Sequence, residues 1–258
     1  MKSRVQIMSK LSFLSALVWA TPGFASDDAL TRRQVAFDLG SYQPAISKNQ
    51  DAVEFFELMY GKYNSPMMGT LSVHEYPWRN HGLVGWGVKV GVWKVDGPAR
   101  LCKSGTEMVG CSSTTVFDSE PGNTPTRLTV LPLSVEAVYR YDYLRRAHGV
   151  ALEPYVKAGL DYHLWWANTN GEIAERTVDG QKQRGKGGTA GYHGSVGLMV
   201  NLDWLEPRTA ARARKNSGIA GTFLFVELNR VFGDGFGDRA RLDMSDQQLK
   251  IGFAMDFL

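Results

Sequence analysis

The sequence of 258 residues predicts an all-β protein, an antiparallel transmembrane β-barrel of eight strands. Two long segments, 128–141 and 152–166, alternate between apolar and polar residues with the period of two that a β-strand imposes. Strands of soluble sheets commonly run about five or six residues, and these two segments are much longer. One face of each is apolar, and the other carries charges and glycines. This pattern is typical of a closed barrel that stands in lipid and has a polar interior.

The first 25 residues have the pattern of a signal peptide. Lys2, Arg4 and Lys10 precede the apolar run 11–20, and small residues at Gly23 and Ala25 predict cleavage after Ala25. The apolar run is shorter than the roughly 20 residues that a membrane-spanning helix needs. We therefore expect an exported protein in which residues 26–258 form one barrel domain.

The charge pattern limits the possible partners. The net charge of +3 belongs to the predicted leader, and the rest of the chain carries 26 basic and 26 acidic residues. A balanced chain offers no electrostatic surface for nucleic acid. No later segment has 18 consecutive apolar residues, so export and long alternating strands predict the outer membrane of a Gram-negative envelope. We expect a monomer surrounded by outer-membrane lipids and lipopolysaccharide.

Eight strands and two short helices follow in order along the chain. The strands are predicted at 34–42, 66–76, 83–95, 128–141, 152–166, 189–202, 219–230 and 247–258, and the helices near 51–60 and 203–217. Barrels of this type have long exterior loops and short periplasmic turns. The exterior loops are then 43–65, 96–125, 167–188 and 231–242, and the periplasmic turns are 77–82, 142–150 and 203–217. Ten or twelve strands are the alternative if residues 102–117 contain a further hairpin.

The last predicted strand resembles the terminal assembly signal of outer-membrane proteins. Its outward residues are apolar up to Phe257, although the chain ends one residue later on Leu258 rather than on the aromatic residue of that signal. The resemblance implies the barrel-assembly machinery as a partner during biogenesis.

Several sequence blocks, in order, are similar to a family of outer-membrane β-barrel proteins of unknown function found in myxobacteria and their relatives. The blocks are LPLSVEAVYRYDYL (131–144), EPYVKAGLDYHLWW (153–166), GGT (187–189), DWLEPR (203–208) and FLFVEL (223–228). The resemblance covers most of the chain after the leader. It implies location and fold, but it brings no activity and no catalytic residues.

Nine charged residues lie at inward positions of the predicted strands, and their signs nearly balance. They are Asp38, Lys89, Glu136, Arg140, Lys157, Asp161, Glu227, Lys250 and Asp256. Buried charges are tolerated when they are paired, and an eight-stranded barrel is just wide enough for side chains to fill it. We therefore predict a lumen network that fills the barrel, with an ion-conducting pore as the alternative. Glycines on the inner face would let a narrow barrel close without overfilling it.

Cys102 and Cys111 are the only cysteines, and both fall in one exported loop. An oxidising periplasm favours a disulfide between them. Free thiols or half of a metal site are the alternatives, but the loop has no histidine or third cysteine to complete a zinc set. The sequence gives no metal or cofactor motif.

His193 and Ser195 share a face of one strand, so they could serve as base and nucleophile, with Asp161 or Glu153 orienting the ring. The His-x-Ser spacing is similar to that of small outer-membrane lipid A deacylases. In those enzymes the site faces the lipid, whereas the strand phase here turns both side chains into the lumen. A polar lumen pair is the favoured interpretation.

Four tryptophans near predicted strand ends, Trp86, Trp93, Trp165 and Trp166, are expected to form aromatic belts at the membrane interfaces. The sequence as a whole favours a structural or surface-contact protein with a largely filled polar lumen. A channel for small solutes or hydrophobic ligands is the alternative, and a lipid A-modifying hydrolase is the third possibility.

Overall fold

The computed structural model describes residues 32–45, 66–104, 107–110, 119–178, 181–237 and 242–258. The predicted signal peptide and the predicted helix near 51–60 lie outside these ranges. Both remain predictions.

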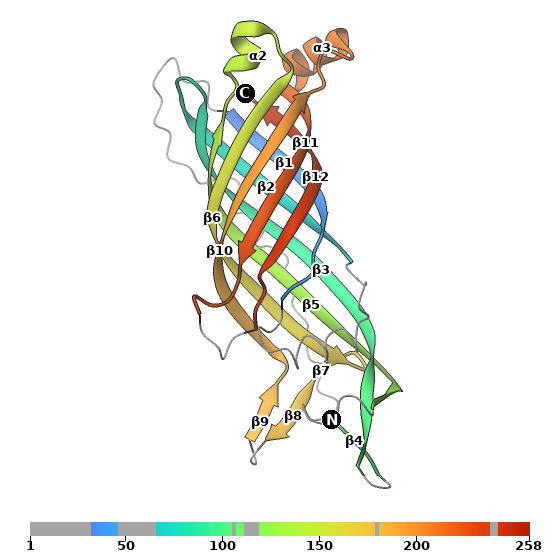
Figure 1. The fold of residues 1–258 in the computed structure, drawn as a ribbon. Coiled ribbons are helices and arrows are strands. Elements are labelled where there is room, and N and C mark those ends of the chain that lie inside the picture. The colour runs from blue at the N-terminus through green and yellow to red at the C-terminus, as the bar shows by residue number, and fades with distance from the viewer. Residues whose placement is uncertain (1–31, 46–65, 105–106, 111–118, 179–180, 238–241) are drawn as a thin grey trace, which may run out of the picture.

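Eight antiparallel strands close into a barrel, as predicted (Figure 1). The strands are β1 (Arg32–Ser41), β2 (Met67–Arg79), β3 (Leu83–Ser104), β5 (Ser119–Arg140), β6 (Leu152–Thr169), β10 (Lys186–Asn201), β11 (Ile219–Phe232) and β12 (Asp246–Phe257). β1 pairs with both β2 and β12, and the pairing of β10 with β6 closes the ring. Closure leaves no barrel edge with unpaired backbone groups, which is the condition for a strand structure to lie in lipid.

The segments 96–125 and 167–188, predicted as loops, contain more strand than expected. β3 and β5 continue to pair well beyond their predicted ends, with a register shift between Pro98 and Arg100. A proline has no backbone N–H to donate, so the glycine- and proline-rich composition interrupts the ladder without ending it. The end of the barrel from which β3 and β5 extend also carries four short strands: β4 (Glu107–Gly110), β7 (Glu172–Ile173), β8 (Glu175–Val178) and β9 (Gln181–Arg184) (Figure 1). β4 pairs with β3 outside the closed ring, so the described chain has no ten- or twelve-stranded barrel.

Two helices lie at the other end, beside the carboxyl terminus (Figure 1). α3 (Pro207–Ser217) corresponds to the helix predicted at 203–217. α2 (Tyr143–His148) lies in the segment 142–150, which was predicted only as a turn. No residue of α2 is buried. Its sequence therefore lacks the apolar periodicity by which a buried helix is predicted. Neither described helix is long and apolar enough to cross a bilayer.

Gly218 ends α3. Its φ is 67°, and its N–H donates a hydrogen bond to the carbonyl oxygen of Ala213. This left-handed conformation costs a residue with a Cβ roughly 1–2 kcal/mol. We therefore expect Gly218→Ala to lower the free energy of unfolding by about 1 kcal/mol, measured by urea titration, while Ser217→Ala at the adjacent exposed position changes it much less. Equal effects of the two substitutions would contradict this account of the helix end.

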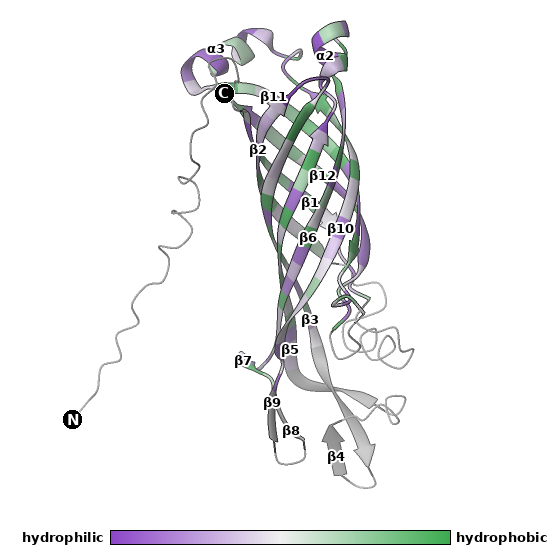
Figure 2. Cartoon of the chain, turned by 90° about the vertical axis from the view of Figure 1, so that its left-hand side faces the viewer, coloured by the Kyte–Doolittle hydropathy of each residue, from purple (hydrophilic) through white to green (hydrophobic). Residues whose placement is uncertain are grey.

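The two faces of the barrel wall differ in chemistry. Along β5, Leu133 and Val135 are exposed on the outside, whereas Ser134 and Glu136 are buried in the lumen. The same alternation runs along the other barrel strands, and Figure 2 shows it as alternating hydrophobic and hydrophilic residues. An apolar outer wall around a polar interior is the arrangement that lipid on the outside requires.

Candidate functional site

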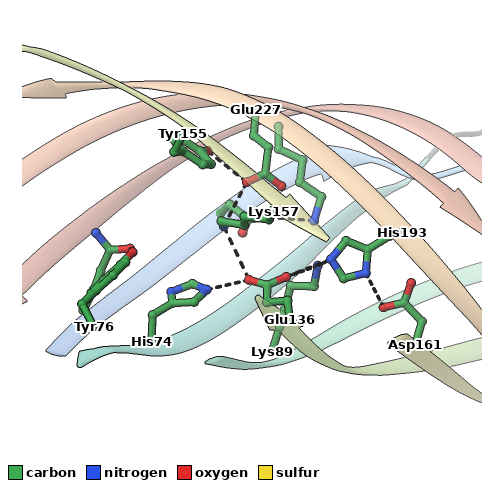
Figure 3. Close-up of polar contacts among 12 residues, drawn as sticks. His74, Tyr76, Lys89, Glu136, Tyr155, Lys157, Asp161, His193 and Glu227 are labelled. Atoms are coloured by element: carbon green, nitrogen blue, oxygen red, sulfur yellow. Dashed lines mark hydrogen bonds and ion pairs between the residues drawn. The ribbon is translucent and has the colours of Figure 1, made fainter. Parts of the chain in front are cut away.

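Glu136 on β5 is the centre of a network of polar side chains in the lumen, here called the central network (Figure 3). Its Oε1 lies 2.6 Å from His74 Nε2 and 3.6 Å from Lys157 Nζ. Its Oε2 lies 3.1 Å from Lys89 Nζ and 2.9 Å from His193 Nε2. The five side chains come from five different strands, so this one carboxylate connects opposite sides of the barrel.

The central network continues through two further carboxylates. Lys157 Nζ lies 3.0 Å from Glu227 Oε2, and the Tyr155 hydroxyl donates a 2.9 Å hydrogen bond to the same oxygen. His193 Nδ1 lies 2.8 Å from Asp161 Oδ1. Each lysine is therefore held by at least one carboxylate, as burial of a charge requires.

Glycines on the inner face make room for the two histidines. A Cβ added at Gly87 would lie 2.3 Å from His74 Cδ2, and one added at Gly159 would lie 2.7 Å from His193 Cε1. Both glycines face residues of the central network. Side chains at either position would displace the rings that contact Glu136.

A second polar group, here called the helix-side network, lies nearer the helices. Arg140 contacts both Glu153 and Asp256, with 3.0 Å between Arg140 Nη1 and Asp256 Oδ1, and its guanidinium lies 4.3 Å from the ring centroid of Phe223. Gln34 donates a 3.0 Å hydrogen bond to Asp256. The guanidinium is thus paired on its edges and stacked on one face, which suits a planar, delocalised cation.

All nine predicted network residues are buried in the lumen. The central network contains Glu136, Lys89, Lys157, Asp161 and Glu227. The helix-side network contains Arg140 and Asp256. Lys250 and Asp38 form a separate pair, with 3.3 Å between Nζ and Oδ1. The prediction of these nine residues omitted His74 and Glu153, although both lie at inward positions of their strands.

The lumen is apolar at the end from which β3 and β5 extend, opposite the helices. Tyr42, Met68, Trp93, Val95, Leu128, Val130 and Met244 form a buried cluster there, with Trp165, Ala167 and Leu242 packed against it, and we call it the apolar plug. Trp93 Nε1 donates a 3.0 Å hydrogen bond to the carbonyl oxygen of Pro66, and the Trp93 ring meets the Tyr42 ring edge to face at 5.3 Å. Apolar side chains thus fill the part of the lumen that the two charged networks do not occupy.

This placement corrects the predicted tryptophan belt. Trp93 is 1% exposed and Trp165 packs on the plug, because both occupy inward positions of their strands. Trp86 is exposed on the outer wall, and Trp166 lies on the outward face and is partly exposed. Two of the four tryptophans are therefore placed where they could contact lipid.

Of the candidate catalytic residues, His193 and Asp161 belong to the central network, whereas Ser195 makes no hydrogen bond with it. Both ring nitrogens of His193 lie within 3 Å of a carboxylate oxygen, one from Glu136 and one from Asp161. Ser195 is buried beside it, and its hydroxyl has no hydrogen-bond partner among the described residues. A general base needs a ring nitrogen directed at the nucleophile. His193 here is a bridge between two carboxylates, and its lumen position separates it from lipid acyl chains.

Within the described ranges, no group of three or more His, Cys, Asp or Glu residues is arranged to hold a metal ion. Cys111 lies outside the described residues, and of Cys102 only the backbone is described. The disulfide between them therefore remains a prediction.

Comparison with known proteins gives similarities of structure only. No protein-family model matches this sequence, and no curated protein matches it. A major outer membrane protein from Thermus thermophilus is 13% identical at a TM-score of 0.41, covering 87% of this chain and 99% of its own. Neisserial surface protein A is 7% identical at a TM-score of 0.41, covering 88% of this chain and 96% of its own. OprG from Pseudomonas aeruginosa is 11% identical at a TM-score of 0.40, covering 89% of this chain and 97% of its own.

The class of the protein follows from its own geometry. A closed antiparallel barrel with an apolar outer wall and paired charges inside is the architecture of integral outer-membrane β-barrel proteins. The fold and the lumen define this chain as a protein of that class.

Proposed function

We propose that this barrel is a membrane anchor with a lumen closed to solutes, and that it acts in envelope integrity or surface contact through the strands that extend from one end. The observation that carries the proposal is the filling of the lumen in layers. The central network crosses the barrel at Glu136, the helix-side network crosses it at Arg140, and the apolar plug closes the end opposite the helices.

The lengths of the connections support an orientation in the membrane. The β2–β3 turn and the connection that contains α2 are short, and they lie with the longer α3 connection at the end that carries the carboxyl terminus, as expected of the periplasmic side. The opposite end carries the extended β3 and β5 and the β8–β9 hairpin (Figures 1 and 2). These strands are the surface that the anchor would present outside the cell.

Conductance tests the closed lumen directly. We expect the purified protein, reconstituted in a planar bilayer, to show no steady ion-selective openings, because paired side chains occupy the lumen. Insertion is checked in parallel by resistance of the barrel to protease in vesicles. Regular openings, or swelling of liposomes in small sugars, would instead support the channel alternative.

The export route and the family are part of the same proposal. The leader pattern of residues 1–25 supports secretion and cleavage after Ala25, and the ordered blocks from 131–144 to 223–228 support membership of the myxobacterial-type barrel family. Sequencing the amino terminus of the mature protein from membranes tests the cleavage. Mass spectrometry of the unreduced protein tests the Cys102–Cys111 bridge, and alkylation of both thiols would refute it.

A further inference from the structure

A groove of about 510 Å³ lies on the wall formed by β10, β11 and β12, and it opens to the outside. The three strands are consecutive neighbours in the barrel (Figure 1). Gly194 on β10 faces outward, and a Cβ added there would meet no atom within 4 Å. The exposed side chains of Val196 and Leu228 border the gap. Lys157, Ser195 and Asn229, which are buried in the lumen, complete the lining. The groove therefore has an apolar border at Val196 and Leu228, on the surface that faces lipid.

Arg230 gives this groove a positive charge. It faces outward on β11 between Leu228 and Phe232, and it pairs in register with Gly194. Its guanidinium donates a 2.9 Å hydrogen bond to Gln247 Oε1 and lies 5.5 Å from the ring centroid of Phe232. Asp246 on β12 interacts with it electrostatically, but among the described residues no carboxylate forms an ion pair with it. An anion would therefore have no directly bound carboxylate to displace from Arg230.

The depth of Arg230 indicates where that anion would be. Arg230 lies two residues before the end of β11 and far from the helices. Next to it, the Tyr192 ring stacks on Phe232 at 4.8 Å and on Phe236 at 6.3 Å, and all three rings are exposed. Exposed aromatic rings mark the membrane interface, and an outward arginine is costly at the middle of the bilayer but nearly free at the interface. In the proposed orientation this is the headgroup level of the outer leaflet.

We propose that the groove binds one phosphorylated glycolipid of the outer leaflet, namely lipopolysaccharide through a phosphate of its lipid A part. Arg230 would hold the phosphate, since a guanidinium matches phosphate in charge and geometry, and Gln247 keeps the guanidinium in place. An acyl chain would lie over Gly194 between Val196 and Leu228. The site rests on the proposed function, because such a lipid reaches this wall only if the barrel lies in the outer membrane.

The test compares lipid A that carries two phosphates with fully dephosphorylated lipid A, by native mass spectrometry of the barrel in detergent. We expect the phosphorylated lipid to bind the wild-type protein about tenfold or more tightly than the dephosphorylated one, as a charge-assisted hydrogen bond would give. Arg230→Gln should abolish this preference. Gly194→Leu should weaken binding of both lipids by filling the groove.

Two control variants keep the outcome specific. Arg127→Gln removes an outward arginine that pairs with Asp96 elsewhere on the barrel, and Ala137→Leu enlarges an outward residue on β5. Neither should change binding. Equal binding by wild type and Arg230→Gln, or equal loss in the controls, would overturn the site. Insertion of the protein into phospholipid vesicles without lipid A is measured separately, so a failure to insert would count against the proposed function and not against the groove alone.

Discussion

Replacing Glu136 with alanine should destabilise the barrel by about 3–5 kcal/mol. The Glu136 side chain is fully buried and contacts Lys89, Lys157 and both histidines of the central network. Its removal leaves Lys89 with no ion-pair partner among the described residues and opens a gap at the middle of the lumen. Breaking a buried pair from one side is far more costly than removing an exposed one, because the remaining charge stays out of water.

The measurement is reversible unfolding by urea in detergent micelles or lipid vesicles, followed by tryptophan fluorescence. Glu75→Ala is the matched control, because Glu75 lies 3.1 Å from Arg33 in a pair whose arginine is half exposed. Exposed pairs contribute about 0–1 kcal/mol, so this variant should stay close to wild type. If Glu136→Ala also unfolds within about 1 kcal/mol of wild type, the central network does not hold the lumen together.

A second substitution separates charge from packing. Adding Lys89→Met to Glu136→Ala removes one of the two lysine charges that contact Glu136, while keeping an unbranched side chain of similar length. Since an apolar residue can replace a buried ion at little or no cost, the double variant should recover part of the lost stability. Loss of stability equal to the sum of two independent effects would show that packing, and not charge pairing, dominates at this position.

The barrel was predictable because one physical rule governs every strand. Alternation with period two, apolar outward and polar inward, identified all eight barrel strands. The rule holds only where lipid contacts the wall. Past Val95 β3 and β5 continue to pair, but the sequence there is rich in Gly, Ser, Thr and Pro and no longer alternates, so the prediction ended β3 too early at Val95 and began β5 too late at Leu128.

The contents of the lumen were predictable by type but not by partner. Alternation places Lys89, Glu136 and Lys157 inside, and the structure shows them inside. Glu136, however, contacts His74 and His193 from β2 and β10, which are not the strands paired with β5. Contacts across a lumen depend on the tilt and stagger of the strands, which a single sequence does not specify.

Trp93 shows that alternation is a better guide than position along a strand. Val84, Trp86, Val88, Val90 and Val92 share the outward face of β3, so an odd-numbered neighbour must point inward. The prediction placed Trp93 in a lipid belt because it lies near a predicted strand end. In the structure the strand does not end there, and the ring packs in the apolar plug.

Trp93→Ala should therefore lower the free energy of unfolding by about 3–5 kcal/mol, the usual cost of truncating a large buried aromatic residue. The variant removes the contact with Tyr42 and the hydrogen bond to Pro66, and it leaves a cavity among Met68, Val95 and their neighbours in the plug. Urea unfolding of the reconstituted barrel measures the change.

Trp93→Phe is the matched variant, because it keeps most of the ring and loses the N–H that donates to the Pro66 carbonyl. Its cost should be nearer 1 kcal/mol, the typical contribution of one hydrogen bond. Tyr42→Ala combined with Trp93→Ala should cost less than the two single changes together, since the rings pack on each other at 5.3 Å. A near-neutral Trp93→Ala would mean that the ring lies on the lipid side, and the plug would then lose its largest side chain.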